Sequence, residues 1–351
     1  MTNKKFLIFS VSITLVILVL FGGLTVAVDP LFHYHKPLNN LSYPIHNQRY
    51  QNTGIAKNFS YDAIITGTSM TENFKASQFD DLFGVNTVKL SFSGSMFKEQ
   101  RDMLEKAFNS GNNIKYVVRS VDDYAILADK DARSDFDYPD YLYDKNVLND
   151  VNYFLNKSIL FDYTYKVFER TKSSQKTTNF DQYTYWSDYM AYGKEPVIER
   201  YTRPDEAQSY AVFTESDFER AKQNVQQNII DLAKHHPDTQ FFLFFPPYSI
   251  INWDNWNQMK VIDYKIDVMK SFAELVFECD NISLFSFFDD TDMICDLNNY
   301  KDLEHYGGWI NEYILNSFKS GEHKLTKENY VEHFNTLRDF YSNYNYSDLM
   351  S

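Results

Sequence analysis

The chain has 351 residues and a mass of 41.5 kDa, enough for one large domain or two ordinary ones. Hydrophobic residues make up 44% and charged residues 23%, so wholesale disorder is excluded. Asp and Glu (48) outnumber Lys and Arg (34), and the resulting charge of -14 would repel a phosphate backbone, so no nucleic-acid partner is expected. Two cysteines are too few for a disulfide scaffold or a Cys-rich zinc site. The sequence does not decide whether Cys279 and Cys295 form one disulfide or are two free thiols.

The N-terminus predicts a membrane anchor. Lys4 and Lys5 precede an uncharged run from Phe6 to Val28. At about 1.5 Å per residue the run extends about 34 Å, enough to cross a hydrocarbon core of about 30 Å. The lysines before the run predict a single-pass protein of the cell membrane whose remaining chain lies outside the cytoplasm. A cleaved signal peptide is the alternative, although such peptides usually have apolar segments of about 7–15 residues.

Short apolar runs bounded by polar residues recur five times after residue 60 and predict buried strands. These runs are Ala63–Thr66, Thr87–Leu90, Tyr116–Val118, Gln240–Phe245 and Ser283–Phe287. Amphipathic segments that predict helices lie between and after them. These segments are Lys98–Asn109, Ser216–His235, Met259–Glu278 and Trp309–Phe318. Alternating strands and helices predict an α/β fold with a mainly parallel five-stranded sheet and helices on both faces.

The same patterns predict the domain organisation. The anchor occupies residues 1–28, and residues 29–60 lack periodicity, which predicts a stalk. The α/β domain covers 61–320 and contains an insertion at 124–215, rich in Tyr, Asp and Asn, that is expected to cap the loop end of the sheet. Residues 321–351 form a tail with one predicted helix at Lys327–Tyr341.

Candidate catalytic residues follow two of the strands. In an open α/β sheet, ligands bind at the carboxyl ends of the strands. Ser69 follows the first strand in the turn Gly67-Thr68-Ser69-Met70, although a serine there is more often a helix cap. Asp302 and His305 follow the last strand, at a spacing that fits one helical turn, where a carboxylate can orient an imidazole. A serine nucleophile needs such a histidine to accept its proton, so the three predict acyl transfer with Ser69 as nucleophile.

These motifs resemble those of the SGNH (GDSL-type) hydrolase superfamily. Asp302-Leu303-Glu304-His305 is similar to its D-x-x-H block, and Ile65–Met70 is similar to its nucleophile block, with Gly-Thr-Ser in place of Gly-Asp-Ser. Ser91-Phe92-Ser93-Gly94 resembles the block that contributes a glycine N–H to the oxyanion hole. The resemblance implies a three-layer α/β/α sandwich, no cofactor and no metal, and an oxyanion hole made by the backbone N–H groups of Ser69 and Gly94.

The third block departs from the family pattern. The superfamily has Gly-x-Asn-Asp, whose Asn amide donates to the oxyanion, whereas this chain has Ser120-Val121-Asp122-Asp123. An ionised Asp122 has no hydrogen to donate and would repel an oxyanion. Loss of one such donor typically costs about 10²–10³ in rate. We therefore expect a specialised esterase or a transferase, and the alternative is a catalytically silent SGNH-like protein that binds a polymer or acts as a scaffold.

The anchor and the stretch Phe245-Pro246-Pro247-Tyr248-Ser249 resemble the membrane-anchored D-alanyl-transfer and polysaccharide O-acylation proteins of this superfamily. That resemblance implies action on a cell-envelope glycopolymer such as a teichoic acid, with a membrane-bound O-acyltransferase as a possible partner. Asp122, Tyr248 and Trp253 are candidate substrate-binding residues, because they follow strands at the active edge and aromatic rings can stack on sugars. Packing of the aromatic residues against the insertion is the equal alternative.

Overall fold

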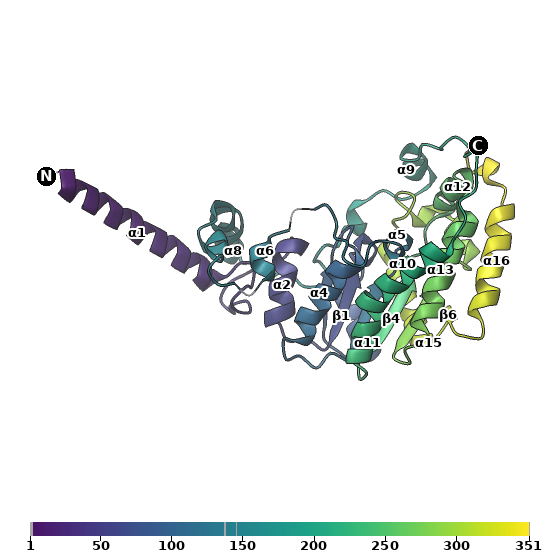
Figure 1. Cartoon of the computed structure of the whole chain (residues 1–351). Coiled ribbons are helices and arrows are strands. Elements are labelled where there is room, and N and C mark those ends of the chain that lie inside the picture. Colours follow the sequence, from purple (N-terminus) through teal and green to yellow (C-terminus); the bar gives the residue numbers. More distant parts are fainter. Residues whose placement is uncertain (1–2, 137, 145, 351) are drawn as a thin grey trace. The chain divides into compact units, whose positions relative to one another are not determined.

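The structure is a computed structural model that describes residues 3–136, 138–144 and 146–350. The chain divides into two compact units (Figure 1). The smaller contains residues 3–60 and 136–183, and the larger contains residues 61–135 and 184–350. Residues 136–183 of the predicted insertion therefore belong to the smaller unit with the N-terminal segment, and the two ends of the insertion belong to the larger unit.

The larger unit contains one sheet, with strands in the order β2-β1-β3-β4-β5-β6. The strands are β1 (Ala63–Gly67), β2 (Thr87–Ser91), β3 (Tyr116–Ser120), β4 (Gln240–Phe245), β5 (Ile282–Ser286) and β6 (Lys324–Leu325). The first five are parallel, which confirms the predicted fold class, and β6 adds a short antiparallel edge in the segment predicted as a tail. The chain leaves β1 toward β2 on one side and later returns to β3 on the other. The carboxyl end of β1 is therefore a topological switch point, where open α/β sheets bind ligands.

Helices cover both faces of the sheet, so the larger unit is a three-layer α/β/α sandwich (Figure 1). Its helices are α3 (Ala76–Phe83), α4 (Phe97–Phe108), α5 (Asp123–Ile126), α9 (Lys194–Glu199), α10 (Glu215–Val225), α11 (Asp231–His235), α12 (Ile250–Gln258), α13 (Ile262–Val276), α14 (Thr291–Cys295), α15 (Gly308–Ser320) and α16 (Tyr330–Asn343). One face carries α3 and α15, and the other carries α4, α10, α11, α13 and α16.

Strand β4 shows why both faces are apolar. Successive side chains of a strand point to opposite faces. Phe242 stacks on Phe318 of α15, with ring centroids 5.2 Å apart, whereas Phe245 contacts Phe272 of α13 at 5.6 Å. Because each face of β4 meets a helix, the strand is a continuous run of apolar residues and not an alternating one.

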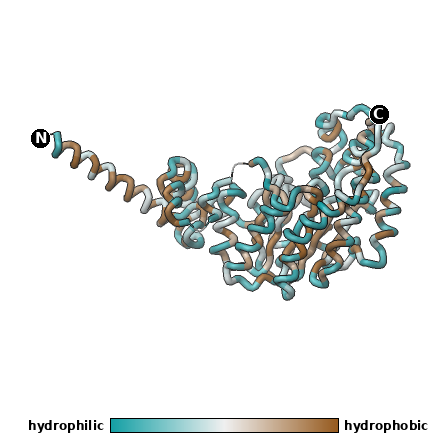
Figure 2. Tube along the Cα trace, in the orientation of Figure 1, coloured by the Kyte–Doolittle hydropathy of each residue, from teal (hydrophilic) through white to brown (hydrophobic). Residues whose placement is uncertain are grey.

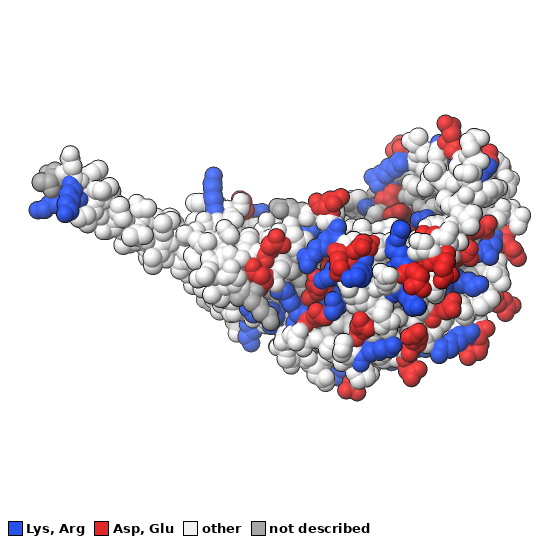
Figure 3. Space-filling view, viewed as in Figure 1, with Lys and Arg blue, Asp and Glu red and all other residues white. Residues whose placement is uncertain are grey.

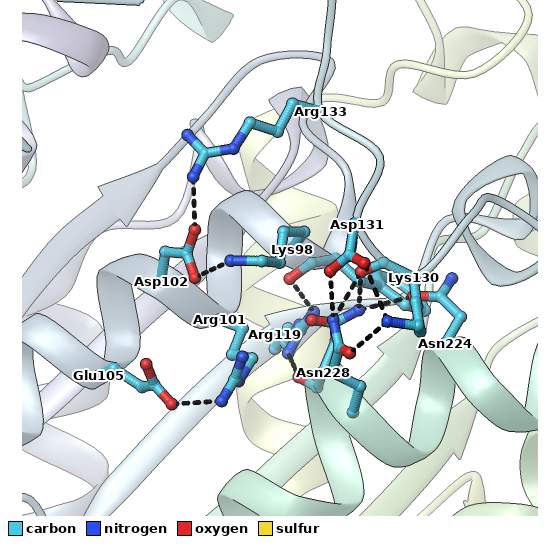
Figure 4. A network of polar contacts seen from close by, with 12 residues as sticks. Lys98, Arg101, Asp102, Glu105, Arg119, Lys130, Asp131, Arg133, Asn224 and Asn228 are labelled. Carbon is cyan, nitrogen blue, oxygen red and sulfur yellow. Dashed lines mark hydrogen bonds and ion pairs between the residues drawn. The ribbon is translucent and has the colours of Figure 1, made fainter. Parts of the chain in front are cut away.

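A buried polar network ties β3 to the helices that cover it (Figure 4). The Arg119 guanidinium, which is 1% exposed, donates to Gln100 Oε1 at 2.7 Å and to the carbonyl oxygens of Asn228 (3.0 Å) and Phe97 (3.3 Å). Asn228 lies in the π-helical turn Gln226–Ile230 between α10 and α11, and burial lowers the pKa of Arg119 to about 9. This network fixes β3, whose carboxyl end adjoins the candidate site.

The smaller unit begins with α1 (Asn3–Val28), which is long and apolar enough to cross a membrane. Only 6% of its apolar window is buried within the protein, and Figure 2 shows it mostly in the hydrophobic colours. Asp29 ends the helix. Its buried carboxylate accepts hydrogen bonds from the backbone N–H groups of His33, Tyr34 and His35 and from the Tyr153 hydroxyl, at 2.6–2.9 Å.

Further helices of the smaller unit are α2 (Gln48–Asn58), α6 (Asp140–Tyr143), α7 (Val151–Phe154), η2 (Ile159–Thr164) and α8 (Tyr165–Lys172). Helix α2 lies in the segment predicted to be a stalk without periodicity. Its buried residues include Gln51 and Asn52, which bond to Pro30 and Pro44 carbonyls and to the Tyr183 hydroxyl. Because polar residues form its buried side, α2 has no apolar stripe that a periodicity search would detect.

Candidate active site

The turn after β1 presents Ser69. Gly67 has φ +137°, and a Cβ atom there would lie 2.3 Å from Ser120 Oγ, so the turn requires glycine. Thr68 caps the short helix Ser69–Thr71 by accepting a hydrogen bond from the Met70 N–H at 3.3 Å. The capping role that a residue after a strand usually has therefore belongs to Thr68, and the Ser69 hydroxyl is available for another contact.

That contact is His305. Ser69 Oγ and His305 Nε2 are 2.8 Å apart, although the two residues are 236 positions apart in the sequence. On the other side of the ring, His305 Nδ1 lies 2.9 Å from Asp302 Oδ1 and 3.1 Å from Oδ2. The structure thus brings the three predicted residues into one hydrogen-bonded chain of hydroxyl, imidazole and carboxylate. The side chains of His305 and Asp302 are 22% and 24% exposed, so the chain is open to solvent.

The segment from Asp302 to His305 is a tight loop and not the helical turn expected from the spacing. Asp302 Oδ1 accepts the backbone N–H groups of Glu304 (3.0 Å) and His305 (2.8 Å), which bends the chain toward the carboxylate. An isolated bridge between Tyr300 and Tyr306 closes the loop. Short polar side chains often bond nearby backbone groups in this way and so replace helical hydrogen bonds.

The segment after β4 holds the same loop in place. Ser249 donates to the Leu303 carbonyl from its backbone N–H (3.1 Å) and its hydroxyl (2.7 Å). The Tyr300 hydroxyl donates to the Pro247 carbonyl at 2.9 Å. These contacts fix the position of His305 relative to the sheet.

Asp302 is ionised over the physiological pH range. Burial alone would raise its pKa, but the hydrogen bond and the electrostatic attraction between the carboxylate and the His305 ring, together with the two backbone N–H groups, lower the pKa to about 2. A carboxylate at Nδ1 selects the tautomer with a proton on that nitrogen and leaves Nε2 to accept a proton from Ser69.

Two backbone N–H groups are available to stabilise an oxyanion. Within the described residues, neither the Ser69 nor the Gly94 N–H has an acceptor. Gly94 has φ +66°, and its loop is held against the nucleophile turn because Phe92 N–H (2.8 Å) and Ser95 Oγ (3.4 Å) both donate to the Gly67 carbonyl. Backbone N–H groups of this kind stabilise the tetrahedral intermediates of acyl transfer.

Asp122 is buried, and its carboxylate accepts hydrogen bonds from three hydroxyl groups of the protein. Oδ2 accepts the hydroxyls of Thr68 (2.9 Å) and Ser120 (3.1 Å), and Oδ1 accepts the Tyr248 hydroxyl at 3.0 Å. Burial raises the pKa of Asp122 to about 6, although the three hydroxyl donors oppose the shift. All three hydrogen bonds of the Asp122 carboxylate are made to other residues of the protein. Through Thr68, Asp122 positions the nucleophile turn, and this role accounts for a carboxylate at this position without a contact to substrate.

Tyr248 and Trp253, the other candidate substrate-binding residues, are also buried. Tyr248 is 2% exposed and holds Asp122. Trp253 is fully buried and stacks on Tyr341 of α16, with ring centroids 3.6 Å apart and planes at 5°. In this fold neither ring presents a surface to a substrate. Both rings pack within the protein as the alternative expected, but their partners are Asp122 and α16 and not the insertion.

Trp186, which the sequence analysis did not single out, borders the site instead. Its ring meets the His305 ring edge to face at 5.7 Å, and Lys301 Nζ lies 3.9 Å from its centroid. The indole N–H donates to Glu72 Oε2 at 2.7 Å, and the backbone N–H donates to Asn73 Oδ1 at 3.0 Å. Trp186 belongs to the aromatic-rich insertion, whose composition was visible, but no local motif distinguishes this ring from its neighbours.

In the described part of the chain, no group of three or more His, Cys, Asp or Glu residues could hold a metal. Cys279 is buried, Cys295 is half-buried, and both are free thiols.

No family model matches the sequence, and no curated protein matches it. Among solved structures, the fold is similar to a protein from Streptococcus pneumonia described provisionally as a platelet activating factor. The two are 11% identical over 78% of this chain and 90% of that chain, with a TM-score of 0.41. At this degree of similarity, the side-chain geometry of the site itself is the basis for assigning its chemistry.

Proposed function

We propose that the protein is a serine acyl esterase or acyltransferase, anchored in the cell membrane by α1, that acts outside the cytoplasm on a cell-envelope glycopolymer. The observation that carries the chemistry is the hydrogen-bonded chain from Ser69 through His305 to Asp302. The anchor and the sequence resemblance support the location and the substrate class, with a membrane-bound O-acyltransferase as a partner that donates or accepts the acyl group.

The geometry supports a two-step reaction. Ser69 Oγ attacks the acyl carbonyl carbon while His305 Nε2 takes the hydroxyl proton, and Asp302 stabilises the imidazolium that forms. The Ser69 and Gly94 N–H groups bind the oxyanion. Collapse of the intermediate transfers the proton from His305 to the leaving oxygen and leaves an ester on Ser69. Water or a polymer hydroxyl then attacks this ester, with His305 again as base, and the choice between them separates an esterase from a transferase.

A fluorophosphonate probe tests this chemistry because it phosphonylates activated serines. We expect the full-length wild type to be labelled and Ser69→Ala and His305→Gln to lose the label, whereas His235→Gln, which changes an exposed histidine, should keep it. Mass spectrometry of envelope polymers from cells with wild type or Ser69→Ala would then identify the acyl group. Labelling of Ser69→Ala to the wild-type level would refute the assignment of the nucleophile.

A catalytically silent binding or scaffold protein is the competing candidate. It is favoured by one observation, the replacement of the third oxyanion donor by an Asp122 that faces the protein. Two donors remain, and loss of one donor reduces the rate of such enzymes by about 10²–10³ without abolishing it. Failure of the wild type to react with the probe in a native-like bilayer would favour this candidate.

A further inference from the structure

The smaller unit carries an exposed apolar face on the continuous helix formed by η2 and α8. Phe161, Tyr165 and Phe168 follow one another at spacings of four and three, which places them on one side of the helix. Their exposed fractions are 56%, 60% and 40%. Ile159 and Val167, on the other side, are buried. Large aromatic residues grouped on one face of a soluble protein mark an interaction surface.

The position of this helix along α1 indicates what covers that face. Both α7 and η2 pack against α1. A Cβ atom at Gly22 would lie 3.3 Å from Phe154 Cδ2 and 3.6 Å from Leu155 Cδ2. Gly22 precedes Val28, the end of the apolar run, by about 9 Å along the helix axis. If α1 spans a bilayer, the segment against Gly22 lies several ångströms below the outer edge of the hydrocarbon.

The charges of this segment favour the same location. The exposed lysines of residues 151–172 are Lys157, Lys166 and Lys172. With Arg170 they outnumber the two acidic residues of that range, Asp162 and Glu169, in a chain whose overall charge is -14. Figure 3 shows α1 itself without charged atoms beyond the basic residues at its N-terminal end. A locally basic segment beside exposed aromatic rings is typical of protein that lies in an anionic membrane surface.

We propose that residues 151–172 form an interfacial collar around the outer end of α1, with Phe161, Tyr165 and Phe168 inserted in the outer leaflet and the exposed lysines at anionic lipid headgroups. Long lysine stems allow the ammonium groups to reach the headgroups while the rings stay in the acyl region. This inference rests on the proposal that α1 spans the membrane and is independent of the catalytic assignment of Ser69.

Spin labels on the full-length protein in bilayers that contain phosphatidylglycerol test the collar. Single cysteines replace Phe161, Leu15 in the middle of α1, or Val212, which is 73% exposed in the larger unit, in a background without Cys279 and Cys295. A spin label that lies in lipid collides often with oxygen, which dissolves in the hydrocarbon. A spin label that lies in water collides often with a water-soluble nickel complex. We expect Phe161→Cys to behave like Leu15→Cys, with oxygen collisions dominant, and Val212→Cys to show the opposite.

The labels at Phe161 and Leu15 distinguish failure of the interfacial collar from failure of the membrane anchor. A label at Phe161 that collides with nickel as often as the label at Val212, while the label at Leu15 stays in lipid, would overturn the collar and leave the anchor intact. A label at Leu15 in water would overturn both. The lysine contacts are tested with Lys166→Glu combined with Lys172→Glu, which should raise nickel collisions at Phe161 in anionic but not in phosphatidylcholine bilayers. An equal effect in both bilayers, or none in either, would overturn the headgroup assignment.

Discussion

Replacement of Asp122 by Asn should change how the stability of the protein depends on pH. Asp122 is 3% exposed and accepts three hydroxyl hydrogen bonds, from Thr68, Ser120 and Tyr248. An asparagine has the same shape and can keep these contacts, because hydroxyl groups both donate and accept and can rotate to face an amide nitrogen. The substitution therefore removes one titrating group with little change in packing.

The magnitude follows from the pKa shift. Burial raises the pKa of Asp122 from 3.8 to about 6 in the folded protein. Since the folded pKa is the higher one, the contribution of Asp122 to stability is fully present below pH 3.8 and is lost as the pH rises through about 6. A shift of about two units corresponds to about 3 kcal/mol. Relative to wild type, Asp122→Asn should thus gain about 2 kcal/mol of unfolding free energy between pH 4 and about pH 7, because the unfolded carboxyl is already partly ionised at pH 4.

Urea unfolding of the detergent-solubilised full-length protein, followed by tryptophan fluorescence from pH 4 to pH 8, measures this difference. Groups that do not interact with Asp122 titrate alike in both proteins and cancel when the two curves are subtracted. Glu304 cancels only in part, because burial and the charge of Asp122 raise its pKa to about 7, so the difference near pH 7 includes its response. Asp205→Asn, at an exposed position, is the matched control and should follow wild type throughout. A wild-type-minus-variant difference that stays constant across this pH range would refute the conclusion that Asp122 titrates near pH 6.

Three further predictions concern the same site. Asp302→Asn should lower kcat on an activated ester by about 10⁴-fold with little change in fold, because the amide no longer selects the His305 tautomer; a loss below tenfold in steady-state kinetics would contradict this role. Gly84→Ala should destabilise the protein by about 1–2 kcal/mol, because Gly84 has a positive φ. Gly67→Ala should destabilise it by more, because Gly67 also has a positive φ and a Cβ atom there would meet side-chain and backbone atoms within 3.0 Å. Equal melting temperatures of the two variants would contradict this prediction. Trp186→Ala should slow fluorophosphonate labelling by freeing the His305 ring while leaving the melting transition cooperative, and an unchanged labelling rate would show that the indole has no part in positioning it.

The candidate site also shows which of its features can be predicted from local sequence. Ser69 and the pair Asp302 and His305 were selected because each follows a predicted strand, and parallel strands bring their carboxyl ends to one edge. The structure places Ser69 Oγ 2.8 Å from the His305 ring. The conformation around Asp302 was not predictable from spacing, since an interval of three residues suits both a helical turn and the observed loop, and bonds from Ser249 and Tyr300 to distant backbone groups stabilise the loop.

The sequence by itself determined the five parallel strands, the apolar α1 and the residues of the hydroxyl–imidazole–carboxylate chain, because buried strands and membrane-length helices are set by local hydrophobic patterns. Only the tertiary structure decided the roles of residues whose partners are distant in the chain. Asp122 and Trp253 occupy positions at the active edge, yet one is satisfied by three buried hydroxyls and the other stacks on Tyr341. Trp186 reaches His305 from an insertion without a motif. Whether a polar or aromatic side chain meets substrate or protein depends on long-range packing, and no local pattern encodes that choice.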